Sequence, residues 1–418
     1  SAPDSVPGVA TVRSDTTLET HDYDPLPTLR PRFWEPVWAP AVRSRGVDVI
    51  EPSLGVLTSA EDLVGRHAVD AQLLVSLSDR RVSGSVGYAY RGLGNPVLSA
   101  RVSQGWDAGA RRAVVEQDTV DLFLVERERN ASLAATFLRR RVRRSLSLML
   151  SGGMAWEGRS LLDADLSESA LRLARPDVRL TDLRASAGFS TARGHAFSVS
   201  AEEGLSVSVT GRTRDELDVP ADARGVLGLD RSVDEVYGQL RGYLDLPGPG
   251  FADHVLALRV SAGLARGPGA DPSHYDVGGV AGGREPFTGL GLFGGTARFF
   301  PVRGFENGDR SGREAWSATL EYRFPLALVN EGLGLIPIHL DRVSGSVFLD
   351  AGNAWGPEEG GDFYRDNLRR DALASTGVEV LTDVLTFFSI PVTLRAGVAF
   401  PLRVREGAVG YVSFGRPF

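Results

Sequence analysis

The sequence predicts an all-β fold: a 16-stranded antiparallel β-barrel that crosses a membrane. Three observations favour this fold. Segments of about 9–14 residues alternate apolar with small or polar side chains, about sixteen of them follow one another, and the connections between them are alternately long and short. Each segment is close to the roughly 10 residues that a tilted transmembrane strand needs. A soluble β-sandwich would have shorter strands, of about 5–6 residues.

The alternation is clearest in three segments of the C-terminal third. In AWSATLEYRF, 315–324, the large apolar side chains share one face and Glu321 lies on the other. In DRVSGSVFLDAGNAW, 341–355, Asp350 lies opposite the valines, and VTLRAGVAF, 392–400, keeps its arginine opposite Val, Leu and Phe. Because the charges are confined to one face, we expect that face to line the lumen and the other to contact lipid.

The predicted strands occupy one continuous barrel domain, residues 46–418, after a proline-rich periplasmic segment, residues 1–45. The strands are predicted at 49–58, 66–77, 81–90, 96–106, 112–126, 131–141, 144–157, 180–193, 195–207, 233–246, 252–265, 313–325, 342–355, 371–382, 391–400 and 407–418.

The lengths of the connections predict which rim faces outward. The long connections are 158–179, 208–232, 266–312 and 356–370. Tight turns such as SDRR, 78–81, and PGPG, 247–250, are predicted on the opposite, periplasmic rim. Long outer loops and short periplasmic turns are typical of bacterial outer-membrane barrels.

Composition excludes several other classes of protein. The net charge is −7, so no basic surface for nucleic acid is indicated, and all 46 basic residues are arginines. The absence of cysteine excludes disulfides and thiolate metal sites, and the six histidines are scattered. We therefore expect no cofactor, no metal ion and no catalytic residue. The sequence contains no run of about 18 apolar residues, so no transmembrane helix is predicted.

Four motifs, in this order and spacing, resemble those of the BamA-type superfamily, the C-terminal bacterial surface antigen barrel. They are FPVRGF at 300–305, LEYRFPL at 320–326, GSVFLDAGNAW at 345–355 and the terminal FGRPF. The resemblance implies a location in the bacterial outer membrane, a barrel of sixteen strands, and a sixth outer loop that folds into the lumen. Members of the family insert barrels into the membrane or pass polypeptides across it.

By this resemblance, Arg303 is the arginine at the tip of the inward loop, and Asp350 and Glu321 are its partners on the barrel wall. Strand parity agrees, because both acids face the predicted lumen. A guanidinium between two carboxylates forms bidentate, charge-assisted hydrogen bonds that lysine cannot reproduce. Glu379, inward-facing on the next strand, is a candidate third partner. The alternative is that Arg303 is a solvated loop arginine.

The neighbours of this arginine complete the predicted lock of the loop. Gly304 would allow a backbone turn where a Cβ would clash, and Val302 and Phe305 would fill the adjoining space. Gly352, in the FLDAG motif, faces the same lumen. The loop itself, 266–312, is rich in glycine but contains several aromatic residues, which indicates a packed loop.

The C-terminal strand carries two further predicted features. Val412, Phe414 and Phe418 form an alternating apolar pattern that resembles the terminal strand signal read during outer-membrane assembly. The seam glycines Gly407, Gly410 and Gly415 would weaken strand pairing, which favours a lateral seam between the first and last strands. The alternative is that these glycines accommodate loop aromatics inside the lumen.

Two functions remain open on the sequence alone. The first is outer-membrane protein insertion or polypeptide translocation through the seam, with unfolded barrel clients or periplasmic and lipoprotein subunits as partners, beside membrane lipids and lipopolysaccharide. The second is a non-catalytic anchor or plugged pore that holds a periplasmic or surface complex. It is favoured because residues 1–45 are too short and proline-rich for the POTRA domains that handle clients in this family. A diffusion porin is disfavoured, since the long loop would obstruct the lumen.

Overall fold

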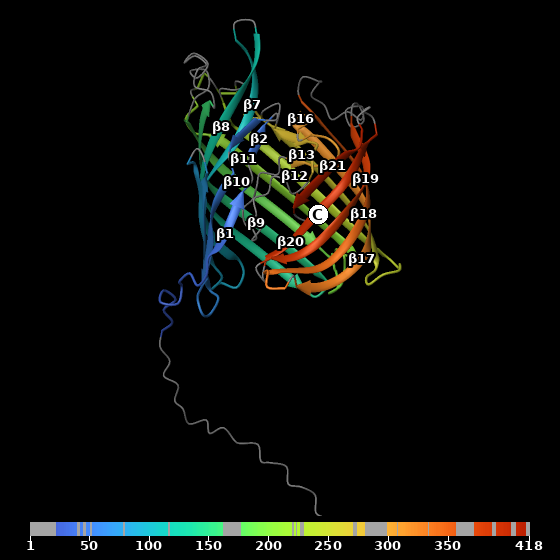
Figure 1. The fold of residues 1–418 in the computed structure, drawn as a ribbon. Helices are drawn as coiled ribbons and strands as arrows, with labels where there is room; N and C mark the ends of the chain where they lie inside the picture. The colour runs from blue at the N-terminus through green and yellow to red at the C-terminus, as the bar shows by residue number, and fades with distance from the viewer. Residues whose placement is uncertain are drawn as a thin grey trace, which may run out of the picture.

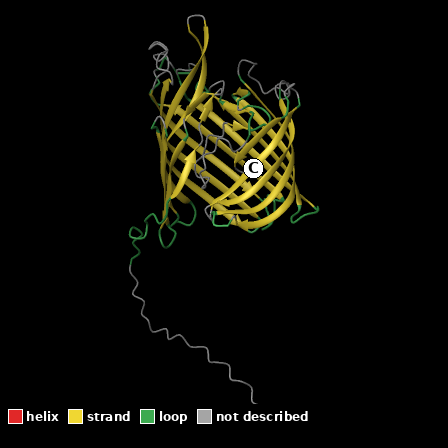
Figure 2. Cartoon of the chain, viewed as in Figure 1, coloured by secondary structure: helices red, strands yellow, loops and turns green. Residues whose placement is uncertain are grey.

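The fold is one large antiparallel sheet that curves around a lumen (Figure 1). The computed structural model describes residues 22–39, 42–44, 47–50, 52–77, 80–115, 118–161, 177–219, 221–222, 224–225, 230–270, 274–280, 299–306, 308–332, 334–356, 372–386, 390–402 and 407–414. Strands form the wall and loops lie at both rims (Figure 2). No helix in these ranges is long and apolar enough to cross a membrane.

Sixteen strands form the sheet, in the order β1-β4-β5-β6-β7-β8-β9-β10-β11-β12-β13-β17-β18-β19-β20-β21. Their bounds are β1 Glu35–Ala39, β4 Ser53–Glu61, β5 His67–Ser76, β6 Val82–Tyr90, β7 Val97–Val115, β8 Asp118–Arg141, β9 Arg144–Leu161, β10 Asp177–Ser190, β11 Gly204–Glu216, β12 Val233–Leu246, β13 His254–Arg266, β17 Glu314–Gly332, β18 Ile338–Trp355, β19 Leu373–Thr386, β20 Ile390–Pro401 and β21 Val409–Phe414. Along the chain, a separate hairpin of β2 Val42–Ser44 and β3 Val47–Ile50 comes between β1 and β4.

The predicted division into an inward and an outward face agrees with the burial of the side chains. On β17, Thr319 and Glu321 are buried, whereas the alternating residues Leu320 and Tyr322 are exposed. Because the exposed face is apolar and the buried face polar, the sheet has the polarity of a barrel surrounded by lipid. The all-β, antiparallel fold class is therefore confirmed.

The prediction of where the sheet begins was wrong. The first strand is β1, not 49–58, and it lies inside the segment assigned to the periplasm. β1 has only five residues and contains Pro36, so it resembles a linker in sequence. Proline is tolerated there because one side of β1 has no strand partner in the described sheet.

The predicted strands at 96–106, 112–126 and 131–141 are in fact two strands, β7 and β8, of 19 and 24 residues. They form a hairpin that rises well above the rim in Figure 1, so their pattern continues beyond the length a membrane requires. Sixteen strands were predicted and the sheet has sixteen, but only because one predicted strand too many in this region compensates for the missed β1.

The turn at 78–81 was also assigned to the wrong rim. It joins β5 to β6, and in an alternating antiparallel sheet this places it on the same rim as the long connection between β13 and β17. The turn at 247–250 lies on the opposite rim, as predicted. The strand predicted at 195–207 is displaced, because β11 begins at Gly204 and residues 191–203 form a turn of their own.

Candidate functional site: the inward loop and the barrel wall

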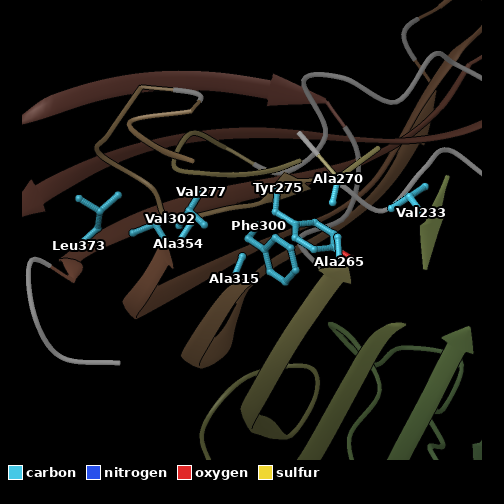
Figure 3. Close-up of a cluster of buried hydrophobic side chains, with 10 residues drawn as sticks. All are labelled: Val233, Ala265, Ala270, Tyr275, Val277, Phe300, Val302, Ala315, Ala354 and Leu373. Carbon is cyan, nitrogen blue, oxygen red and sulfur yellow. The ribbon is translucent and has the colours of Figure 1, made fainter. Parts of the chain in front are cut away.

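The connection between β13 and β17 folds against the inner wall. It contains a small sheet of β15 Phe299–Phe300, β14 Tyr275–Val277 and β16 Arg310–Gly312, in that order. Side chains of the loop and of the wall share one buried apolar cluster (Figure 3), whose members are Val233, Ala265, Ala270, Tyr275, Val277, Phe300, Val302, Ala315, Ala354 and Leu373. The described parts of this loop are therefore packed.

Arg303 lies at the tip of this packed segment and is itself 3% exposed. Its Nε donates to Asp350 Oδ2 at 2.7 Å, and its Nη2 donates to Oδ1 at 2.8 Å. The backbone N–H of Arg303 donates to the same Oδ2 at 3.1 Å. The contact is thus bidentate, and lysine could not form it.

Two more carboxylates approach the same guanidinium from the neighbouring strands. Glu321 Oε1 on β17 lies 2.8 Å from Arg303 Nη2, and Glu379 Oε2 on β19 lies 3.5 Å from Nη1. The aromatic ring of Phe348 on β18 lies with its centroid 3.5 Å from Arg303 Cζ, in cation–π geometry. Arg303 therefore connects the loop to three consecutive strands of the wall, and the solvated alternative is wrong.

Further buried arginines of the wall surround these carboxylates, and one of them, Arg259 on β13, interacts electrostatically with Asp350 and Glu321. Arg323 Nε donates to Glu321 Oε2 at 2.8 Å, and Arg395 Nη2 donates to Glu379 Oε1 at 2.7 Å. Burial alone would lower the pKa of Arg303. The negative charge of Asp350 and its hydrogen bonds to the guanidinium outweigh this effect, with help from Glu321 and Glu379. The pKa of Arg303 therefore lies well above its ordinary value. Arg323 and Arg395 were missed as site residues, although strand parity already placed both on the inward face.

The remaining predicted lock residues fit closely around the arginine. Gly304 has a φ of +89°, and a Cβ there would lie 3.0 Å from the Cβ of Ala399. Val302 is fully buried, and a Cβ on Gly352 would come within 2.8 Å of it. Phe305 is partly buried against the apolar cluster. The positive φ explains glycine at position 304, and the close packing of Val302 explains glycine at position 352.

A second ion-pair network lies on the wall formed by β8 to β12, and sequence reasoning missed it. Arg214 pairs with Glu128 and, at 2.7 Å, with Glu157; Arg212 donates to Asp182 at 2.9 Å and contacts Glu235 at 3.4 Å. His274, 4% exposed, reaches Glu235 Oε2 from the loop with its Nε2, at 2.8 Å. The inward loop is therefore tied to the wall at two places.

The C-terminal residues are only partly described. Val412 is 74% exposed on the outer face, and Phe414 pairs with Leu394. A Cβ at Gly407 or at Gly410 would meet no atom of the described residues within 4 Å. Phe287 and Phe293 of the loop lie outside those residues, so the alternative role of these glycines stays a prediction. Gly415 and Phe418 lie outside the described residues, as does the side chain of Phe414.

No group of three or more His, Asp or Glu side chains in the described ranges is placed to bind a metal ion. The inward cluster instead contains arginines and carboxylates in mutual ion-pair contact. Such an arrangement fixes a loop in position.

Comparison with known proteins identifies the family. Residues 75–384 match the Omp85 superfamily domain. The chain belongs to the Omp85 superfamily. It is a bacterial outer-membrane β-barrel, and the resemblance to the BamA-type family is confirmed.

Two solved structures are similar to this Omp85 chain. One is BamA from Haemophilus ducreyi lacking POTRA domains 1–3, with a TM-score of 0.52 at 14% identity, covering 91% of this chain and 69% of that one. The other is CdiB from Escherichia coli, with a TM-score of 0.52 at 12% identity, covering 91% of this chain and 61% of that one. No curated protein matches the sequence significantly. These likenesses show the fold.

Proposed function

We propose that this Omp85 barrel acts in outer-membrane protein insertion or polypeptide translocation, through a seam between β1 and β21. The observation that carries the proposal is the pair of short strands at the ends of the sheet. β1 has five residues and β21 six, whereas their neighbours β4 and β20 have 9 and 12. In the described part of the chain, neither end strand has a hydrogen-bonded neighbour on its free side.

A free strand edge presents unpaired N–H and C=O groups, and an incoming strand can pair with them. β21 is held to β20 by six residue pairs, whereas β19 and β20 share twelve. Gly410 adds no packing on the lipid side of β21. β1 is held to β4 by five pairs, so both end strands are less firmly paired than the strands beside them.

The inward loop would keep the lumen in shape while the seam moves. Arg303 ties the loop to β17, β18 and β19, which are separated from β21 by β20. The proposed mechanism is strand exchange without covalent chemistry, cofactor or metal ion. Its partners are membrane lipids and lipopolysaccharide, unfolded barrel clients, and periplasmic or lipoprotein subunits.

The second candidate is an anchor or plugged pore that holds a periplasmic or surface complex. The observation that favours it is the density of the two buried ion-pair networks, which fix the loop to the wall at β12 and at β17 to β19. An anchor would keep this plug and would need no movement of the seam.

Reconstitution in liposomes distinguishes the two candidates. The folding rate of an unfolded barrel client is measured by its heat-modifiable gel mobility, with empty liposomes and liposomes containing an unrelated closed barrel as controls. Faster client folding with the Omp85 chain supports insertion. A rate equal to both controls contradicts insertion and favours the anchor.

A further inference from the structure

Tyr411 on β21 directs its side chain to the inner face of the wall. Its hydroxyl donates to Glu379 Oε1 at 2.9 Å, although Glu379 lies two strands away on β19. Gly397 on β20 is the register partner of Tyr411, and a Cβ at Gly397 would come within 2.6 Å of the hydroxyl. The contact between Tyr411 and Glu379 therefore depends on the absence of a side chain at Gly397, on the strand β20 between them.

Glu379 is also part of the cluster around the loop arginine. The same Oε1 accepts from Arg395 at 2.7 Å, while Oε2 lies 3.5 Å from Arg303 Nη1. Glu379 is 2% exposed, so loss of a donor leaves a buried carboxylate less well compensated. One buried carboxylate thus contacts both the closing strand and the inward loop.

We propose that Tyr411 is a positioning residue that couples the position of β21 to the locked state of the loop. When β21 detaches, the hydroxyl leaves Glu379, and the carboxylate that contacts Arg303 loses a donor. Coupling of this kind is reciprocal, so a loosened loop must also weaken the hold on β21. The inference rests on the proposed seam, but its readouts do not involve client folding.

The test is Tyr411→Phe, which removes the hydroxyl and keeps the ring. Loss of a hydrogen bond to a charged group should raise the rate of protease cleavage within the buried segment 300–304 about tenfold. Gly397→Ala, which obstructs the hydroxyl, should act in the same direction. Tyr322→Phe is the matched control, because its hydroxyl contacts His254 and Tyr322 is 38% exposed on the outer wall.

A double-mutant cycle separates coupling from a general loss of stability. In an Arg303→Ala background the loop is already released, so Tyr411→Phe should have no further effect on cleavage. Cleavage of Tyr411→Phe at the parent rate would overturn the inference. An unchanged tenfold effect in the Arg303→Ala background would also overturn it. Failure of the client-folding assay alone would count against the proposed function only.

A second, independent feature is the turn that joins β10 to β11, residues 191–203. Its base is closed by the paired residues Arg193 and Glu203, and its tip reaches β18, beyond the three intervening strands β12, β13 and β17. Arg342 on β18 donates from Nη1 to the carbonyl of Ser198 at 2.6 Å and from Nη2 to that of Ala196 at 3.2 Å.

The same turn and the β12–β13 turn form an open groove of about 340 Å³, lined by Phe197 and Phe251 among others. Arg342 faces inward by strand parity, and its side chain is 14% exposed. We infer that residues 191–203 form a strap that narrows the rim opposite the inward loop, with Arg342 as its latch.

Ion conductance in planar bilayers tests the strap. Because the loop and the strap lie in series, Arg303→Ala/Arg342→Ala should conduct more than Arg303→Ala alone. Arg303→Ala/Arg91→Ala is the control, since Arg91 pairs with Glu61 near the same rim and its side chain is 48% exposed. Equal conductance of Arg303→Ala and its Arg342→Ala derivative would overturn the strap.

Discussion

Replacement of Arg303 by alanine tests the geometry of the inward loop most sharply. The parent cluster pairs three cations, Arg303, Arg323 and Arg395, with Glu321, Asp350 and Glu379. The variant leaves the carboxylate of Asp350, which is 1% exposed, without its bidentate partner. Removal of one partner from a buried pair costs about 3–5 kcal/mol, so the population of detached loop should rise by roughly two to nearly four orders of magnitude.

Limited proteolysis of the folded barrel measures this population, because cleavage within the buried segment 300–304 requires a detached loop. Arg303→Lys should give an intermediate cleavage rate, since lysine keeps the positive charge but cannot form the bidentate contact with Asp350. Arg310→Ala is the matched control in the same loop: its ion pair with Asp309 is exposed, so the change should be under about 1 kcal/mol. The reasoning fails if Arg303→Ala resists cleavage as well as the Arg310→Ala control.

Three further substitutions give graded results. Gly304→Ala, at a φ of +89° and against Ala399, should lower the stability of loop docking by about 1–3 kcal/mol, seen as faster cleavage; a parent-like rate would contradict the strain. Phe348→Leu should cost about 1–2 kcal/mol through loss of the ring beneath the loop arginine, and an unchanged rate would refute that contact. His274→Ala should lower the stability of docking of the loop segment around residue 274 by about 1–3 kcal/mol and move the earliest cleavage sites towards that residue. An unchanged cleavage pattern would argue against the contact between His274 and Glu235.

The face of each strand and the partners of Arg303 could be predicted because both follow from period-two alternation. In a barrel, one face contacts lipid and the other the lumen, so Glu321 and Asp350 had to face inward. The loop motif then named the cation that meets them. Nothing comparable identified the Arg212 and Arg214 network, because its acids come from four other strands and their register is not visible in sequence.

The ends of the strands could not be predicted equally well. β7 and β8 continue beyond the membrane, where charged residues interrupt the apolar pattern without ending the hydrogen-bonded ladder. In residues 195–207 the alternation FSVSA belongs to the strap, and the true strand begins at Gly204. β1 was missed because a five-residue strand with a proline has too little pattern to detect.

The central claim, that a seam between β1 and β21 serves client insertion, is tested most directly by closing that seam reversibly. The chain has no cysteine, so one cysteine in each end strand can be joined by a cleavable bis-maleimide, which alkylates both thiols, without competing thiols. The control pair, Val398→Cys/Gly410→Cys, joins strands that are already paired. We predict that cross-linking the seam abolishes acceleration of client folding and that cleavage of the linker restores it, while the control pair keeps full activity. Equal client folding rates with the seam closed and open would contradict the account.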